Sequence, residues 1–141
     1  MNSDFDTLDV IDLISERHVS LRKRVEELWN SSNELPISNS EWFIIARIYK
    51  KQPTISTLSR QIDISRQGTH KLIKKMESKG LVEIIQSSNK KEKCIYLTEL
   101  GEQCHQKNEA LKASLELKIK EVIGVEQLSS LKHILKQDWG L

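Results

Sequence analysis

The feature that most constrains the fold is a succession of three patterns in the middle of the chain: a short helical segment, a tight turn and a longer helical segment. The short segment covers about 57–61, with Ser56 as its N-cap and with Leu58 and Ile62 facing inward. The turn DIS, at 63–65, leads directly into the longer segment. Two helices joined by a turn of three or four residues form a helix-turn-helix.

The longer segment, 66–77, has an apolar face and a polar face. Leu72, Ile73 and Met76 face inward together with Thr69. In a helix-turn-helix the second helix lies in the major groove, where Arg can fork onto guanine, Gln onto adenine, and Lys can neutralise phosphates. A plain solvated face is the alternative for the lysines. The candidate DNA-binding residues of this helix are Ser65, Arg66, Gln67, Thr69, His70, Lys71 and Lys74.

Gly68 lies inside this helix, where glycine costs roughly 1 kcal/mol relative to alanine. A close approach of the backbone to a neighbour would explain it. The neighbour is either DNA or the preceding short helix, packed tightly in the turn, and we favour the second.

A β-hairpin is predicted directly after the helix. Gly80 is typical of a helix C-cap, and the runs LVEIIQ (81–86) and KCIYLT (93–98) are β-branched and aromatic, with a polar segment between them. Such a wing can lie along the DNA backbone or enter the minor groove, although lysines in a loop can also serve solubility alone. The candidate wing residues are Ser88, Asn89, Lys90, Lys91 and Lys93.

Charge is distributed unevenly along the chain. Residues 50–93 hold eleven Lys or Arg and four Asp or Glu, a net charge of +7, whereas the whole chain carries +2. Such asymmetry suggests that the middle third meets a polyanion. A solvated basic surface would give the same count.

The flanks predict longer helices. Apolar residues recur at three- and four-residue steps over 8–29, and a second helix follows from the N-cap Ser38, with Glu41 completing a capping box, to about Lys51.

Thr98 can cap a long C-terminal helix that Gly124 interrupts. The apolar positions that mark the last helix are Leu128, Leu131, Leu135 and Trp139.

Two segments carry a resemblance to a known family. TISTLSRQIDISRQGTHKLIKKMESKGLV, at 54–82, stands where the MarR (multiple antibiotic resistance regulator) family has its two DNA-binding helices, and NKKEKCIYLTELG, at 89–101, stands at its wing and fifth helix. Leu-Thr-x-x-Gly, at 97–101, is the most telling match. Nearly the whole chain therefore resembles the MarR family of winged helix-turn-helix transcription factors.

The resemblance implies a mainly α fold with a small β-wing: about six helices and a two- to three-stranded antiparallel sheet, in an obligate homodimer that binds double-stranded DNA. The chain would form a single domain, 1–141, with a winged helix-turn-helix module at 38–98 and dimerisation helices at 5–32 and 99–141. One departure concerns the wing. The family pattern there is Asp-x-Arg, and this chain has Asn89 and Lys91, so we expect a phosphate clamp without the planar fork of Arg.

Three aromatic residues are candidates for an effector pocket between the dimer helices and the module, as the resemblance suggests: Trp29, Trp42 and Tyr49. Aromatic residues at helical spacing are also common in a core.

Other chemistry finds little support. Cys94 and Cys104 show no CxxC or Cys/His metal spacing, and they fit a reducing compartment. The neighbours Cys104 and His105 diverge by about 100° on a helix, so they seldom bind one metal together. Cys94 could still oxidise, or it could be a small hydrophobe. We expect no metal, no cofactor and no enzymatic activity. The acidic N-terminus and the lack of a long apolar run predict a cytoplasmic protein without a membrane partner.

These patterns favour a sequence-specific DNA-binding regulator, with repression of a palindromic operator and release by a small molecule or an oxidant. A winged-helix adaptor that docks its basic face on an acidic protein is the alternative. The effector, the operator sequence, the direction of regulation and any oxidant-sensing thiol are not determined by the sequence.

Overall fold

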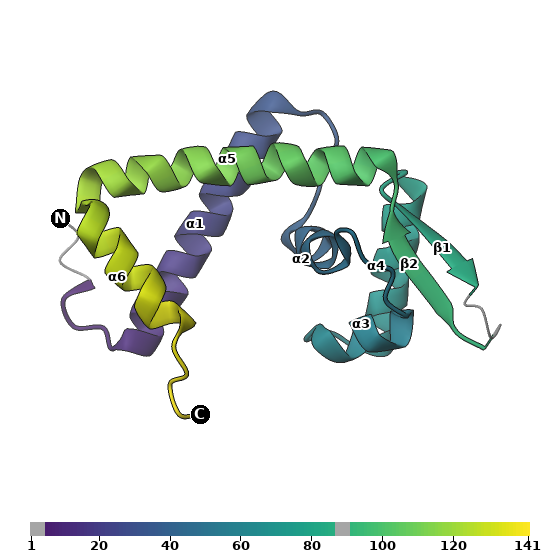
Figure 1. The fold of residues 1–141 in the computed structure, drawn as a ribbon, viewed down its shortest axis with the longest axis horizontal. Coiled ribbons are helices and arrows are strands. Elements are labelled where there is room, and N and C mark those ends of the chain that lie inside the picture. The colour runs from purple at the N-terminus through teal and green to yellow at the C-terminus, as the bar shows by residue number, and fades with distance from the viewer. Residues whose placement is uncertain (1–4, 87–90) are drawn as a thin grey trace.

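The computed structural model of the chain describes residues 5–86 and 91–141. Within these residues it has six α-helices and one antiparallel pair of strands (Figure 1). The strands pair from Val82 opposite Leu97 to Gln86 opposite Lys93. The predicted class, mainly α with a small β-wing, is confirmed. The elements are α1 (Val10–Ser32), α2 (Asn39–Ile48), α3 (Ile55–Gln61), α4 (Arg66–Ser78), β1 (Val82–Gln86), β2 (Lys93–Leu97), α5 (Glu99–Ile123) and α6 (Val125–Lys136).

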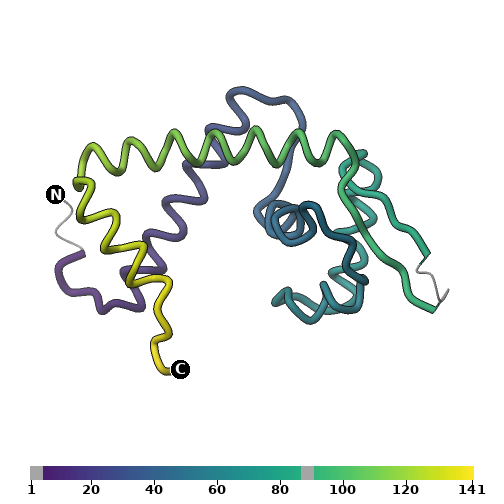
Figure 2. Tube along the Cα trace, viewed as in Figure 1, coloured from purple at the N-terminus to yellow at the C-terminus, as the bar shows by residue number. Residues whose placement is uncertain are grey.

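The longest helix, α5, organises the arrangement. Its 25 residues span about 37 Å at 1.5 Å per residue. It contacts α1, α2, α6 and β2. In Figures 1 and 2, α1 crosses α5, α6 folds back from its C-terminal end, and α2, α3, α4 and the hairpin lie near its N-terminal end. The molecule thus has a helical arm and a compact module, joined by α5.

The core lies in the module. The inner face of α4 supplies Ile73 and Met76, and α3 supplies Leu58. These side chains pack in one cluster with buried residues of α2, the hairpin and the start of α5, and burial of each large apolar side chain contributes roughly 1.5–3 kcal/mol. Because its inner face belongs to this cluster, α4 presents its opposite face to solvent.

Most helix starts agree with the sequence. Ser38 and Glu41 form the predicted capping box: the Glu41 amide donates to Ser38 Oγ at 3.2 Å, and the Ser38 amide donates to Glu41 Oε1 at 2.9 Å. The short helix α3 differs, because it begins at Ile55 and its cap is Thr54, whose Oγ1 accepts from the Thr57 amide at 3.0 Å. Ser56 is therefore not the cap.

Contact with the hairpin explains the earlier start of α3. Thr54 forms an isolated antiparallel bridge with Cys94, and the Ile95 amide donates to the Pro53 carbonyl at 3.0 Å. The backbone at 53–54 is thereby extended beside β2, so the chain turns into helix directly after Thr54.

Two predicted helix ends were too long. α2 ends at Ile48 rather than near Lys51, and Lys50 has a φ of +57°, in the left-handed region that a continuing helix does not use. α6 ends at Lys136, so Trp139 lies beyond it. The Trp139 indole Nε1 instead donates at 2.8 Å to the Ile134 carbonyl, which also accepts from the Gln137 amide at 3.2 Å.

The junction between α4, β1 and α5 explains the two glycines in this region. Gly80, at a φ of +79°, ends α4 with two hydrogen bonds of the Schellman type, from its own amide to the Glu77 carbonyl and from the Leu81 amide to the Met76 carbonyl. At the start of α5, a Cβ on Gly101 would lie 2.2 Å from the Leu81 carbonyl oxygen. The helix can approach the strand this closely only because residue 101 has no side chain.

Among the residues that the structure describes, no helix has the length and apolar content that crossing a membrane requires.

Candidate nucleic-acid interface

The N-terminal turns of α4 form an exposed polar surface of the helix-turn-helix. Ser65 caps the helix: its Oγ accepts from the Gly68 amide at 3.0 Å, and its carbonyl accepts from the Thr69 amide at 2.9 Å. The exposed residues of this surface, all predicted for DNA binding, are Ser65, Arg66, Gln67, His70, Lys71 and Lys74. The structure therefore places these six side chains on one solvent-facing side of α4.

Thr69 does not belong to that surface. Its exposed fraction is 0%, and its hydroxyl donates to the Ser65 carbonyl at 3.0 Å. The prediction that Thr69 contacts DNA is wrong, because the side chain lies on the inward face of α4 beside Ile73 and its hydroxyl is already engaged within the helix.

Gly68 is restricted by its own helix cap. A Cβ at this position would lie 3.1 Å from Ser65 Oγ and 4.0 Å from Ile64 Cβ. The close neighbour is thus the capping side chain, and not the preceding short helix that the sequence favoured. Gly68 lets the Ser65 hydroxyl lie against the first turn and accept its amide hydrogen bond.

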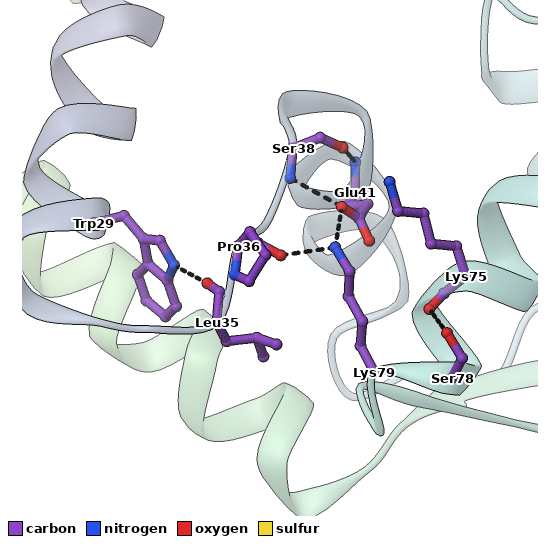
Figure 3. A network of polar contacts seen from close by, with 8 residues as sticks. All are labelled: Trp29, Leu35, Pro36, Ser38, Glu41, Lys75, Ser78 and Lys79. Carbon is purple, nitrogen blue, oxygen red and sulfur yellow. Dashed lines mark hydrogen bonds and ion pairs between the residues drawn. The ribbon is translucent and has the colours of Figure 1, made fainter.

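Two lysines of α4 and its C-cap have different environments. Lys74 is 68% exposed and lies 3.5 Å from Glu77 on the same helix. Lys79 is 15% exposed, and its ammonium group donates to Glu41 Oε1 at 2.8 Å and to the Pro36 carbonyl at 2.7 Å (Figure 3). Lys79 therefore contributes no free cation to the outer surface, and the charge count of the middle third overstates the exposed basic surface by one residue.

Sequence reasoning missed the pairing of Glu41 with Lys79. It found Glu41 as a capping residue, but Lys79 lies 38 residues away and no local pattern connects the two. Burial would raise the pKa of Glu41, yet hydrogen bonds from Lys79 and from the Ser38 amide hold that pKa below its ordinary value of 4.5.

The wing is described only in part. Lys91 and Lys93 are exposed at the β2 end of the hairpin, whereas Ser88, Asn89 and Lys90 lie outside the described residues. On the strands, the hydroxyl of Tyr96 donates to Glu83, directly opposite it, and this bond raises the pKa of Tyr96.

A cavity of about 430 Å³ lies where the arm meets the module. Its walls come from α1, α2, α5 and the turn between α3 and α4. Of the three aromatic residues predicted for a pocket, only Trp42 lines this cavity. Its other lining residues include His18, Arg22, Phe43, Asn108 and Lys112.

Trp29 and Tyr49 have other roles. Trp29 is 1% exposed, packs edge-on against Trp42 with ring centroids 4.8 Å apart, and donates from Nε1 to the Leu35 carbonyl at 2.7 Å. Tyr49 stacks on His105 at 4.0 Å. Neither residue lines this cavity, because Trp29 belongs to the core and Tyr49 packs against the core and His105.

Asn108 is the polar residue of the cavity that sequence reasoning missed. It is 3% exposed, and its Oδ1 has no hydrogen-bond partner among the described residues. A buried acceptor without a donor is costly, by about 1–3 kcal/mol. Nothing in the sequence around Asn108 distinguishes it from a solvated polar residue of a long helix.

Two titratable groups of α5 near the cavity have pKa values that burial shifts towards the neutral form. Burial lowers the pKa of His105, and burial raises the pKa of the Cys104 thiol, which disfavours the reactive thiolate. Cys94 is half-buried in β2. Across residues 5–86 and 91–141, no three His, Cys, Asp or Glu side chains lie close enough to hold a metal ion.

The fold has close counterparts among solved structures. The reduced form of MarR from E. coli superposes with a TM-score of 0.79 at 17% identity, over 92% of this chain and 95% of that one. Streptococcus pneumoniae FabT in complex with DNA gives 0.76 at 19% identity, over 89% and 90%. A mutant E. coli MarR complexed with operator DNA gives 0.75 at 16% identity, over 96% and 97%. A search of curated protein sequences gave no match.

The model described as the MarR family matches residues 35–91, which include all of α2, α3, α4 and β1. Over these residues the chain is similar to the MarR family. Its fold is that of the MarR structures above, in which α3 and α4 correspond to the two helices of the helix-turn-helix and the β1–β2 hairpin corresponds to the wing.

Proposed function

We propose that this protein is a homodimeric, sequence-specific DNA-binding regulator that represses transcription from a palindromic operator until an effector releases it. The observation that carries the proposal is the outer face of α4, where Arg66, Gln67, His70 and Lys71 face solvent above an apolar core that holds the helix in place. The structures of FabT with DNA and of mutant MarR with operator DNA support it by analogy of fold.

The roles of the residues follow from their chemistry. Arg66 and Gln67, in the first turn of α4, read base edges, Arg through a bidentate contact with guanine and Gln through one with adenine. Lys71 and Lys74, further along the same face, neutralise phosphates. Lys91 and Lys93 of the wing act as a phosphate clamp on the flanking DNA backbone.

The homodimer is supported by apolar surface on the arm. One chain leaves many large apolar side chains of α1, α5 and α6 exposed, including Ile11, Leu117, Val122 and Leu131. Contiguous exposed apolar surface is typical of an interface. A dimer through 5–32 and 99–141 would present two α4 helices to half-sites roughly 34–36 Å apart, which matches a palindrome.

Effector release is proposed at the 430 Å³ cavity, since it lies between the arm and the module. The ligand is a small, mainly apolar molecule that packs on Trp42 and Phe43 and donates a hydrogen bond to Asn108 Oδ1. Binding there would change the spacing of the two α4 helices, and a shift of a few ångströms would break several base contacts together.

The test begins with selection of bound fragments from genomic DNA, which yields the operator and its half-site spacing. Fluorescence anisotropy then compares Arg66→Ala and Gln67→Ala with Arg24→Ala, which removes an exposed arginine from α1. We expect the two α4 variants to lose about 1–3 kcal/mol each on the operator and to relax base preference at one position, and Arg24→Ala to change neither.

Salt dependence separates this function from a protein-binding adaptor. The logarithm of DNA affinity should fall with the logarithm of salt concentration by about 0.9 per phosphate neutralised. A flat salt response, or α4 variants whose loss is the same on every DNA sequence, would support the adaptor instead.

A further inference from the structure

A buried carboxylate joins three segments of the chain behind the DNA-facing helix. Glu41 is 0% exposed, and its Oε1 accepts from the Ser38 amide at 2.9 Å and from Lys79 Nζ at 2.8 Å. Lys79 also donates to the Pro36 carbonyl at 2.7 Å. The contacts connect the linker between α1 and α2, the first turn of α2 and the C-cap of α4 (Figure 3).

The same linker is attached to the arm. The indole Nε1 of Trp29, in α1, donates to the Leu35 carbonyl at 2.7 Å, one residue before the Pro36 carbonyl that Lys79 holds. Figure 3 shows the two contacts on adjacent residues of the linker. A continuous polar path therefore runs from α1, through the linker, to the end of α4.

The apolar core alone does not determine the tilt of α4, because hydrophobic contacts have little directionality. Charge-assisted hydrogen bonds do have a preferred direction and are shorter and stronger than neutral ones. Lys79 makes two, and both acceptors belong to segments outside α4.

The position of Lys79 makes a small tilt matter. α4 has 13 residues and is about 20 Å long, so the base-reading turn lies at the opposite end from Lys79. Tilting such a helix by 5° about its C-cap moves its N-terminus by roughly 1.7 Å at this length. A displacement of that size exceeds the range of about 0.5 Å over which N–H···O hydrogen bonds to bases are formed.

We propose that Lys79 is a positioning residue for sequence recognition: held by Glu41 and the Pro36 carbonyl, it fixes the tilt of α4 and so sets discrimination between operator and other DNA, without contacting DNA itself. The inference rests on the DNA-binding function proposed above. It predicts a result that a phosphate-binding lysine cannot give. When the Lys79 contacts are removed, discrimination between operator and other DNA falls, while the affinity for unrelated DNA and its salt dependence stay the same.

The experiment measures the ratio of affinities for the selected operator and for mixed genomic DNA, at several salt concentrations. Lys79→Met removes the ammonium group and keeps most of the stem, and Lys107→Met makes the same change at an exposed position of α5. We expect Lys79→Met to lower the ratio about tenfold with an unchanged salt slope on genomic DNA. Lys79→Arg, which can donate to both acceptors, should restore the ratio, and Lys107→Met should leave it unchanged.

A second variant separates positioning from folding. Lys79→Met alone leaves the Glu41 carboxylate buried without its cation, which can destabilise the module. The double variant Glu41→Gln with Lys79→Met removes both charges, so its melting temperature should recover towards the wild-type value while the ratio stays low. Circular dichroism and thermal unfolding of each variant accompany the titrations.

Two results would overturn the inference. An unchanged ratio in folded Lys79→Met or in the folded double variant would mean that the contacts only stabilise the module. Equal losses on both DNAs, with a salt slope smaller by about 0.9 per half-site, would mean that Lys79 binds a phosphate. A wild-type protein that does not distinguish operator from genomic DNA would refute the proposed function itself, whatever Lys79 does.

Discussion

The two ends of the molecule bury their apolar residues very differently. The module has one continuous core to which α2, α3, α4, both strands and the start of α5 contribute. In the arm, none of the α6 side chains, all of which the structure describes, is buried, and Val122 of α5 is 86% exposed. One chain is sufficient to complete the module, whereas the arm needs a further apolar surface. The difference fits the proposed function, in which the end with the complete core binds DNA and the end with exposed apolar side chains forms the dimer.

The largest effect is expected in the arm, from Leu131→Asp combined with Ile134→Asp on α6. Both side chains are half exposed in one chain and would be covered in the proposed dimer. Because a charge cannot be buried there without a partner, the variant should be monomeric in sedimentation experiments. Loss of the second reading helix should weaken operator binding by at least about 100-fold.

The module of this variant should remain folded, because its core does not include α6. Ser130→Asp introduces one negative charge at an exposed polar position of α6 and should leave the dimer intact. A dimeric double variant, or a monomeric wild-type protein, would contradict the division between the two ends.

Gly101→Ala tests the packing of the module by adding a side chain where α5 meets the Leu81 carbonyl. The added Cβ would lie 2.2 Å from the Leu81 carbonyl oxygen and 2.9 Å from Leu97 Cδ2, so α5 must move away from the hairpin. We expect a loss of about 3 kcal/mol in the free energy of unfolding, measured by urea denaturation. Gln103→Ala, at an exposed position of the same helix, should change it by less than about 0.5 kcal/mol, and an equally small change for Gly101→Ala would mean that the junction is not tightly packed.

The sequence determined the parts of the fold that depend on local chemistry. The capping box at Ser38, the helix-ending glycine at Gly80 and the cap at Thr98 were all predicted, because each depends on residues only a few positions apart along the chain. Helix ends that depend on distant segments were not. The start of α3 depends on β2, which lies about 40 residues further along.

The candidate site shows the same limit. Periodicity was enough to separate the outer face of α4 from the buried Ile73 and Met76. It could not show that Lys79 faces Glu41, nor that Trp29 packs in the core while Trp42 reaches the cavity, because both depend on how segments pack across the fold. A net charge counted from the sequence describes the surface only where the counted residues remain exposed in the fold.

Acid should weaken the module through Glu41. Its pKa in the folded protein is held below the ordinary 4.5, so its contribution is fully present above about pH 4.5 and is lost as the pH falls through the folded value. Glu41→Gln should cost about 2 kcal/mol in the free energy of unfolding at neutral pH, because the charged hydrogen bonds are weakened. The variant should also lose this part of the acid dependence.

Thermal unfolding from pH 7 to pH 3 measures both effects. Glu27→Gln is the control, since Glu27 is about half exposed and pairs with Arg24 on the same helix face. Parallel curves for wild type and Glu41→Gln would mean that the pKa of Glu41 is the same in the folded and the unfolded protein.

The smallest effect on stability should come from the outer face of the module, where Lys74→Ala removes the exposed pair with Glu77. An exposed pair at i,i+3 contributes little, so the free energy of unfolding should change by less than about 0.5 kcal/mol.

DNA binding should nevertheless respond: if Lys74 neutralises one phosphate, the salt slope falls by about 0.9 per half-site, and the loss is the same on operator and genomic DNA. Lys107→Ala on α5 should leave the slope unchanged. A wild-type salt slope in Lys74→Ala would mean that Lys74 does not contact DNA. A loss of affinity confined to the operator would mean that Lys74 takes part in base recognition, because only contacts that differ between sequences can discriminate between them.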